Sequence, residues 1–347
     1  MPARTFLWCT GLRLSVALTL TAVPLAAQSY TPLGAGARLG VLPERTGRVS
    51  SSELAAAPRD GFSYFDPANR SIAHHDGTGR LIRRFLVEPR PDGRLAMIAH
   101  GWYGDVLWVH DPRAATLTMF EGATGERTAT FDESRNNLVQ VEALTPRGAA
   151  VLRGSFPSTR VVGRPPQYGF AVSPGLGLSP EKPAVLIPPD ACEPIRRTGQ
   201  VRDPWCPRSL GVVSPSGEWL ATVRPAEGTT AGRDAVWVTF HSLRGDTIAV
   251  AKVEAPVQER PLPRGAAGDS VRHLPVATSA FATRDGTVWL VQEGGTVNRY
   301  IVVSTTGAVI GRYSTPATVR LVAGTGLRVL GLRTRPNGEV EIVQIGL

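Results

Sequence analysis

The chain is poor in cysteine, in lysine and in long apolar runs. It has three cysteines among 347 residues, and Lys182 and Lys252 are its only lysines. Its longest apolar run, Leu14–Ala27, covers 14 residues, whereas a membrane-spanning helix needs about 20. These absences exclude a multi-span membrane protein and a scaffold held together by many disulfides.

The first 27 residues have the pattern of an export signal. Arg4 and Arg13 precede the apolar run, and small residues stand immediately before Gln28. We expect cleavage after Ala27, a flexible mature segment at 28–37, and a periplasmic or secreted protein without a membrane span. The alternative is a signal that is retained as an anchor.

The positive charge is carried almost entirely by arginine. The chain has a formal charge of +9, and the two leader arginines account for +2 of it, which leaves +7. The arginines are scattered, and no run resembles a nucleic-acid-binding arm. We therefore expect a solvated basic surface and no nucleic-acid partner, with anionic envelope polymers as the alternative use of the charge.

Removal of the leader leaves two cysteines, Cys192 and Cys206. An even pair in an exported chain predicts a disulfide. The bond would close a loop of about 15 residues, for which the chain-entropy model gives roughly 3 kcal/mol. The alternative, a metal site, lacks the histidine or further thiols that zinc requires, so we expect neither a metal nor a cofactor.

A glycine turn followed by a bulky apolar strand recurs along the chain. The six turn glycines are Gly61, Gly104, Gly148, Gly217, Gly286 and Gly326. Their intervals are 43, 44, 69, 69 and 40 residues, and a period near 40 is typical of β-propeller blades. The two long intervals fit the same unit with insertions. Glycine and proline are frequent, as in all-β chains with many turns.

Each unit divides into four short strands. In the second unit we predict strands at Leu95–Ala99, Asp105–Val109, Leu117–Phe120 and Arg127–Phe131. The sixth unit supplies only three, at Thr318–Val322, Leu327–Leu332 and Glu339–Ile345. The segment Arg38–Leu42 can pair with the last of these and close the ring, which removes the open edges. The predicted fold is an all-β, six-bladed propeller over residues 38–347. A seven-bladed ring would need a blade hidden in an insertion.

Some of these repeats resemble NHL-like six-bladed β-propellers. In that family an aspartate ends one strand, an asparagine follows three residues later, and an apolar residue begins the next strand. Asp66-Pro-Ala-Asn69 before Ile72 matches this pattern, whereas Asp111-Pro-Arg-Ala114 before Leu117 lacks the asparagine. Arg284-Asp-Gly-Thr-Val-Trp289 is similar to the strand-opening phrase of related bacterial repeats. The resemblance implies the architecture and leaves the activity open.

The insertions fall on one face of the predicted disc. In a four-stranded blade the A–B and C–D turns share one face, and the B–C and D–A connections share the other. The long segments belong to the second set: 155–167, 188–208, 224–234 and 254–277. Long loops on a rigid scaffold often carry function. We predict a cap over blades three to five with a candidate binding surface of Trp205, Arg196, Arg197, Arg202 and Arg208. The alternative is that these loops are tolerated insertions.

Catalytic residues could not be assigned from the sequence. His74 and His75 are adjacent, so on a strand they point to opposite faces and cannot chelate one ion. The polar residues expected beside the channel are Glu53, Gln140 and Glu142, a poor cage for a hard cation. We expect a non-catalytic, monomeric binding scaffold whose partner is a protein, an envelope polymer or a small ligand. The alternative is a metal-dependent hydrolase of the six-bladed lactonase type at the channel mouth.

Overall fold

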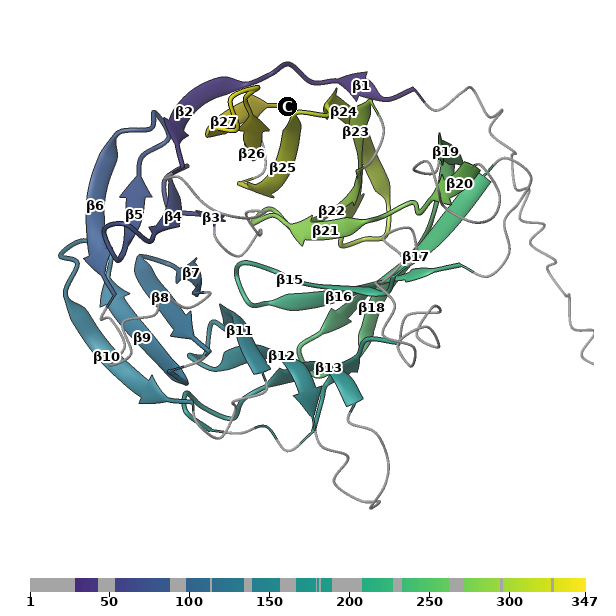
Figure 1. Ribbon diagram of the computed structural model, residues 1–347. Helices are drawn as coiled ribbons and strands as arrows, with labels where there is room; N and C mark the ends of the chain where they lie inside the picture. Colours follow the sequence, from purple (N-terminus) through teal and green to yellow (C-terminus); the bar gives the residue numbers. More distant parts are fainter. Residues whose placement is uncertain are drawn as a thin grey trace, which may run out of the picture.

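The computed structural model describes residues 29–42, 54–87, 98–112, 114–133, 139–156, 167–178, 180, 182–188, 208–226, 233–261, 271–293, 296–325 and 328–347. These residues form a ring of six four-stranded antiparallel sheets (Figure 1). The predicted all-β, six-bladed propeller is confirmed. Within the described part of the chain no helix could span a membrane.

The first three blades follow one another in sequence, and the chain runs through each of them from the inner strand to the outer strand. Blade 1 contains β3 (Leu54–Ala56), β4 (Phe62–Asp66), β5 (Ser71–His75) and β6 (Leu81–Leu86). Blade 2 contains β7 (Ala99–Tyr103), β8 (Val106–Asp111), β9 (Thr116–Glu121) and β10 (Arg127–Asp132). Blade 3 contains β11 (Val139–Leu144), β12 (Ala150–Phe156), β13 (Gln167–Val172) and β14 (Val185–Leu186).

Blade 4 is also formed by consecutive strands, whereas blades 5 and 6 each include a strand from the N-terminal end of the chain. Blade 4 contains β15 (Leu210–Val213), β16 (Trp219–Pro225), β17 (Arg233–Ser242) and β18 (Thr247–Pro256). Blade 5 contains β21 (Ser279–Ala282), β22 (Thr287–Gln292), β23 (Val297–Ser304) and β24 (Val309–Pro316), with β1 (Thr31–Pro32) on its outer edge. Blade 6 contains β25 (Val319–Gly324), β26 (Arg328–Thr334), β27 (Val340–Gly346) and β2 (Ala37–Val41).

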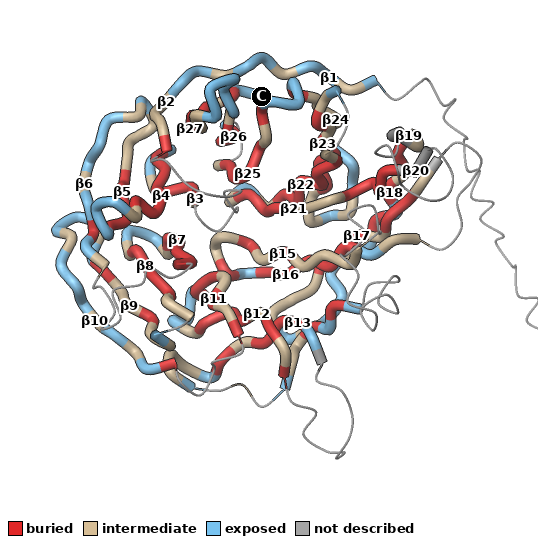
Figure 2. The backbone as a smooth tube through the Cα atoms, viewed as in Figure 1, coloured by how far each residue is buried: buried red, intermediate tan, exposed pale blue. Residues whose placement is uncertain are grey.

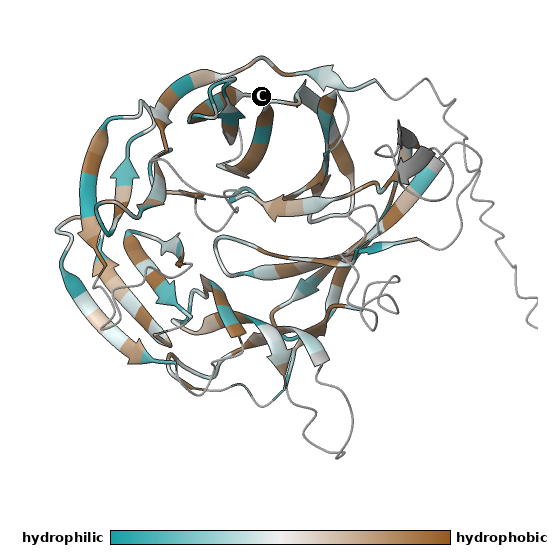
Figure 3. Ribbon diagram, viewed as in Figure 1, coloured by the Kyte–Doolittle hydropathy of each residue, from teal (hydrophilic) through white to brown (hydrophobic). Residues whose placement is uncertain are grey.

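The hydrophobic core is divided among the six seams between neighbouring blades. Each seam has its own cluster of buried side chains, drawn from the facing sheets of two blades. Inner and middle strands are mostly buried or half-buried, whereas most residues of the outer strands β6 and β10 are exposed (Figure 2). Hydrophilic and hydrophobic residues mix along β6 and β10 (Figure 3). Trp108, Trp219 and Trp289 are buried.

The inner strand of blade 2 was predicted in the wrong place. β7 spans Ala99–Tyr103 instead of 95–99, and residues 95–97 lie outside the described part of the chain. The Gly101 within this strand made the segment resemble a turn. A Cβ at Gly101 would lie 2.6 Å from the Trp108 ring, so this glycine allows the indole to pack on the strand.

The ring is closed by residues 29–42, which we call the N-terminal belt. Strand β2 pairs antiparallel with β27, as predicted from the incomplete sixth unit. Strand β1 pairs in parallel with β24, which the sequence did not predict. Tyr30, Leu33 and Leu39 also pack into the seams between blades 4 and 5, 5 and 6, and 6 and 1, respectively. The belt therefore contributes to three consecutive seams.

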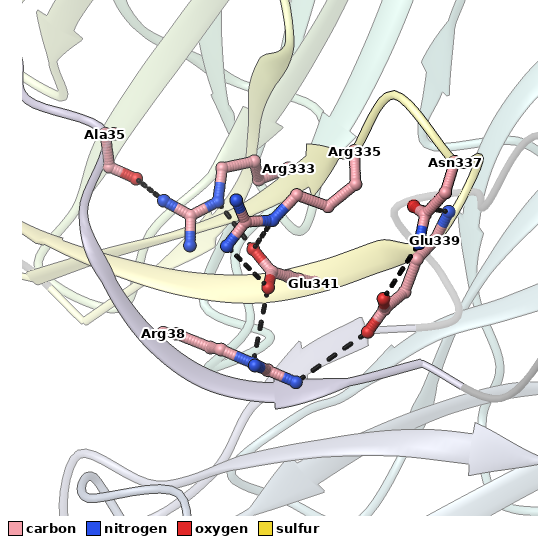
Figure 4. Close-up of polar contacts among 7 residues, drawn as sticks. All are labelled: Ala35, Arg38, Arg333, Arg335, Asn337, Glu339 and Glu341. Carbon is pink, nitrogen blue, oxygen red and sulfur yellow. Dashed lines mark hydrogen bonds and ion pairs between the residues drawn. The ribbon is translucent and has the colours of Figure 1, made fainter.

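A carboxylate on β27 secures the belt electrostatically (Figure 4). The Glu341 side chain is buried and accepts hydrogen bonds from the Nε of Arg333 at 2.6 Å and the Nη2 of Arg335 at 2.9 Å. Arg38 of β2 lies 3.3 Å from the same carboxylate and 3.7 Å from Glu339. The hydrogen bond from Arg335 is the largest effect that holds the pKa of Glu341 below its ordinary value. One buried anion thus connects the N-terminal strand to the C-terminal blade.

The turns between outer strands interlock neighbouring blades. Every C–D connection of blades 1 to 5 has a glycine with positive φ that lies against the outermost strand of the preceding blade or its flanking residues. The five residues are Gly79, Gly125, Gly177, Gly245 and Gly307. A Cβ at Gly79 would overlap the Leu39 carbonyl oxygen, and one at Gly245 would overlap that of Ala184. Blade 6 has no such turn, and at this seam β1 pairs with blade 5 instead.

Because of the interlock, replacing glycine with alanine should destabilise the protein more at Gly79 than at Gly338. Gly79 (φ +89°) and Gly338 (φ +86°) both require the left-handed region, but a Cβ at Gly338 would meet nothing within 4 Å. Gly338→Ala should cost about 1 to 2 kcal/mol of unfolding free energy from backbone strain alone. Gly79→Ala adds about 1 to 3 kcal/mol of overpacking. Urea unfolding of both variants measures the difference, and equal losses would contradict the interlock.

Candidate binding face

The two faces of the disc differ in how their connections are built. The A–B and C–D turns form one face, which we call the turn face. The B–C and D–A connections form the other, which we call the loop face. The connections β12–β13, β14–β15, β16–β17 and β18–β21 all belong to the loop face. The last of these contains an additional hairpin, β19 (Gln258–Pro261) and β20 (Val271–Leu274), within the predicted loop 254–277.

Large apolar side chains are exposed where blade 3 meets the loop face. Tyr168 on β13 and Leu186 on β14 have exposed fractions of 47% and 48%. They occupy adjacent rungs of the β13–β14 ladder, so their side chains project from opposite faces of the sheet. The amide of Ile187 donates a hydrogen bond to the Tyr168 carbonyl oxygen at 3.0 Å. Arg224, at the loop-face end of β16, is also exposed. Exposed aromatic and arginine side chains are typical anchors for a binding partner.

Gln140 and Glu142, two of the predicted channel residues, lie on β11, the inner strand of blade 3. A register shift between Val141 and Ala143 places Glu142 at a β-bulge, a feature that can re-aim a side chain. The Glu142 carboxylate forms an ion pair at 2.8 Å with Arg153 on the adjacent strand β12. Burial raises the pKa of Glu142, and Arg153 opposes this shift. The carboxylate therefore has a protein counter-ion. Glu53, the third predicted channel residue, lies outside the described residues.

A second ion pair joins the end of β22 in blade 5 to the inner strand of blade 6. Glu293 follows β22 and contacts Arg320 on β25. The Glu293 amide donates a hydrogen bond to the Thr278 hydroxyl at 3.1 Å, which fixes the loop-face end of the blade. This ion pair was not predicted from the sequence. The available signal was Arg320, a charged residue inside the otherwise largely apolar predicted strand 318–322. Arg153 and Arg320 both remain partly exposed, with side-chain fractions of 32% and 29%.

Two Asp-Pro segments, which begin at Asp66 and Asp111, stabilise B–C turns on the loop face. Asp66 accepts hydrogen bonds from the Asn69 amide at 3.2 Å and its side chain at 2.7 Å, and from Arg84 at 2.6 Å. These hydrogen bonds lower the pKa of Asp66 and outweigh the opposing effect of burial, the largest single contribution. The Asp111 carboxylate accepts a hydrogen bond from the backbone amide of Ala114 at 3.0 Å. The aspartate can therefore hold the turn through the backbone when the asparagine is missing.

A serine–histidine pair is present in the seam between blades 1 and 2. The Nε2 of His100 lies 3.0 Å from the Ser63 hydroxyl, and the Trp102 indole N–H donates to the same oxygen at 2.9 Å. Ser63 has no exposed surface and His100 is 5% exposed. A nucleophile needs access to its substrate, so this arrangement is a structural hydrogen-bond network that joins two blades.

Most residues of the predicted cap lie outside the described part of the chain. This applies to both cysteines, Cys192 and Cys206, and to four members of the candidate binding surface: Arg196, Arg197, Arg202 and Trp205. The fifth member, Arg208, is half-buried and lies two residues before β15. Among the described residues no group of three His, Cys, Asp or Glu side chains could hold a metal ion.

Comparisons with known proteins show similarity of fold at low identity. Regucalcin, a calcium-binding protein from Agrobacterium tumefaciens, is 14% identical, with a TM-score of 0.43 over 92% of this chain and 97% of that one. A DUF4221 family member from Bacteroides vulgatus is 9% identical, with a TM-score of 0.47 over 88% of this chain and 94% of that one. No family profile and no curated protein matches the chain. At these values no function transfers, and the six-bladed fold rests on the strand topology.

Proposed function

We propose that this protein is an exported, non-catalytic β-propeller that binds a partner through its loop face. The observation that carries the proposal is the inequality of the two faces. On the turn face, the C–D glycines of blades 1 to 5 lie against the preceding blade, and the C–D connection of blade 3 at residues 173–184 is the long exception. The loop face carries the extended connections of blades 3 to 5, including the β19–β20 hairpin. Function concentrates in loops that a rigid scaffold positions.

The partner class follows from the chemistry on and around this face. Tyr168, Leu186 and Arg224 expose aromatic, aliphatic and cationic groups on blades 3 and 4. The arginines of the 188–208 connection would add positive charge, and a Cys192–Cys206 disulfide would hold that segment closed. A protein or an anionic envelope polymer suits such a mixed surface, and the periplasm or the exterior is the expected location.

Site-specific photo-crosslinking tests the loop face directly. A photoreactive residue at Tyr168 or at Arg224 should give covalent adducts in cells of the native host. The same residue at Thr78 or Thr306, in C–D turns of the turn face, is the matched control and should give none. Adducts from the turn-face positions alone would contradict the proposal.

The proposed disulfide has a separate chemical test. Exported protein, unfolded without reductant, should show no reactive thiol when it is titrated, because Cys192 and Cys206 are then paired and Cys9 has been removed with the leader. The reduced protein should show two thiols and should unfold at lower denaturant, at a cost of roughly 3 kcal/mol. Two free thiols in the unreduced sample would refute the bond.

A further inference from the structure

The N-terminal belt is held to blades 5 and 6 by noncovalent contacts alone. Its strands pair with β24 and β27, and the Tyr30 ring lies 5.1 Å from the Arg299 guanidinium carbon and 5.9 Å from that of Arg312. Arg333 donates a hydrogen bond to the Ala35 carbonyl oxygen at 3.4 Å. The covalent chain leaves the belt in the other direction, toward blade 1. The strand that completes blade 6 is therefore joined to the ring on one side only.

The belt and its binding site come from opposite ends of the chain. Arg38 pairs with Val343, so the belt is synthesised long before the strand that receives it. A contact between such distant residues forms late, because the entropic cost of closing the loop must be met first. Until then the belt is unpaired, and blade 6 of any copy lacks its outer strand. A second copy offers the same contacts.

The geometry permits this exchange without threading. Figure 1 shows the belt along the outer rim of the disc, across blades 5 and 6. Residues 43–53 connect it to the start of β3, and an extended stretch of this length reaches about 40 Å. The belt of one ring could therefore extend to the rim of a neighbouring ring.

We propose that blades 5 and 6 bind the belt of a second copy of this chain, which gives a reciprocally exchanged dimer. The charge and shape of the site on blades 5 and 6 specify which segment can bind there. Its arginine at position 38 must meet the carboxylates of Glu339 and Glu341, and its tyrosine at position 30 must lie beside Arg299 and Arg312. A two-fold arrangement satisfies both sites at once and leaves no open sheet edge. This interaction is independent of the loop face, and the dimer it produces differs from the monomer expected from the sequence.

The test uses two full-length chains that carry different affinity tags. The chains are unfolded together, refolded at low and high protein concentration, and purified sequentially on both tags. We expect a doubly tagged complex of dimer mass whose yield rises with concentration. Native monomers that are mixed after folding should give little, because exchange requires the ring to open. If only singly tagged protein is recovered at every concentration, the proposal is overturned.

A competing peptide shows whether the belt makes the contact. A synthetic peptide of residues 29–42, present in excess during refolding, should occupy the site on blades 5 and 6 and suppress the doubly tagged complex. The matched control peptide carries Arg38→Glu, which places a third carboxylate beside Glu339 and Glu341, and it should suppress far less. A complex that is insensitive to the first peptide, or equally sensitive to both, would be held by another surface and would also overturn the proposal.

Discussion

Replacing residues 29–42 with a glycine–serine stretch of equal length is expected to abolish the cooperative unfolding transition. The replacement removes the outer strand of blade 6, the parallel strand on blade 5, and the side chains of Tyr30, Leu33 and Leu39 from three seams. It also leaves the edge of β27 unpaired, and open edges promote aggregation. Circular dichroism during heating, together with light scattering, should show a broad transition and soluble aggregates. A sharp transition near the wild-type midpoint would show that the belt is dispensable.

Two milder substitutions separate the contribution of charge from that of the strand. Glu341→Gln leaves β27 intact but removes the charge that Arg38, Arg333 and Arg335 share. Glu339→Gln removes a more exposed carboxylate whose contact with Arg38 is 3.7 Å. Exposed ion pairs contribute little, whereas loss of a buried carboxylate leaves its arginine partners uncompensated. The melting midpoint should therefore fall clearly for Glu341→Gln and hardly at all for Glu339→Gln.

Strand number and ring closure could be predicted because they depend on local pattern. Turn glycines and alternating apolar residues recur in every unit, and a blade with three strands requires a fourth. The predicted strands 117–120 and 127–131 lie within β9 and β10. Strand β7 was misplaced because a glycine that packs beneath Trp108 and a glycine that makes a turn are identical in sequence.

Interactions between distant residues were not predictable from local pattern. The parallel pairing of Thr31 and Pro32 with blade 5 leaves no periodic signal in two residues. The partners of Glu142 and Glu341 depend on which strands lie side by side and on a β-bulge, both set by the assembled ring. The proposed binding face was predictable only as far as connection lengths reveal it, since the chemistry of a loop depends on its tertiary placement.

Two buried histidines should make the ring unstable in acid. Burial lowers the pKa of both His74 and His110 to about 4, from 6.5. A depressed folded-state pKa contributes stability that is present above pH 6.5 and is lost as the pH falls through 4. Each histidine then accounts for about 3 kcal/mol of unfolding free energy. Carboxylates with lowered pKa, such as Asp66 and Asp76, lose their contribution only below their ordinary value of 3.8. Between pH 6.5 and 4, burial also lowers the pKa of His241 and raises that of Glu142, so variants of His74 and His110 are needed to assign the slope.

The same substitution at the two histidines should have unequal consequences for stability at neutral pH. Neither ring nitrogen of His74 has a hydrogen-bond partner among the described residues, and its ring packs against Trp102 with 4.6 Å between ring centroids. His74→Leu replaces it with an apolar side chain of similar volume and should change the neutral-pH stability by less than about 1 kcal/mol. In contrast, the Nδ1 of His110 accepts a hydrogen bond from the Val141 amide of blade 3 at 3.2 Å. His110→Leu leaves that amide unpaired, which costs about 1 to 3 kcal/mol.

Urea unfolding across pH 8 to 4.5 distinguishes these effects. Both leucine variants should lose part of the acid slope, because each lacks one group that takes up a proton when the ring unfolds. Only His110→Leu should have a lower free energy of unfolding than the wild type at pH 8.

Protonation of His110 in the wild type has the same structural consequence as this substitution, because a protonated Nδ1 cannot accept a hydrogen bond from the Val141 amide. Acid should therefore weaken the seam between blades 2 and 3 through a hydrogen bond, and the seam between blades 1 and 2 through the desolvated charge on His74. Hydrogen exchange at pH 5 should rise first in blade 2, which lies in both seams, and uniform exchange across the ring would contradict this order.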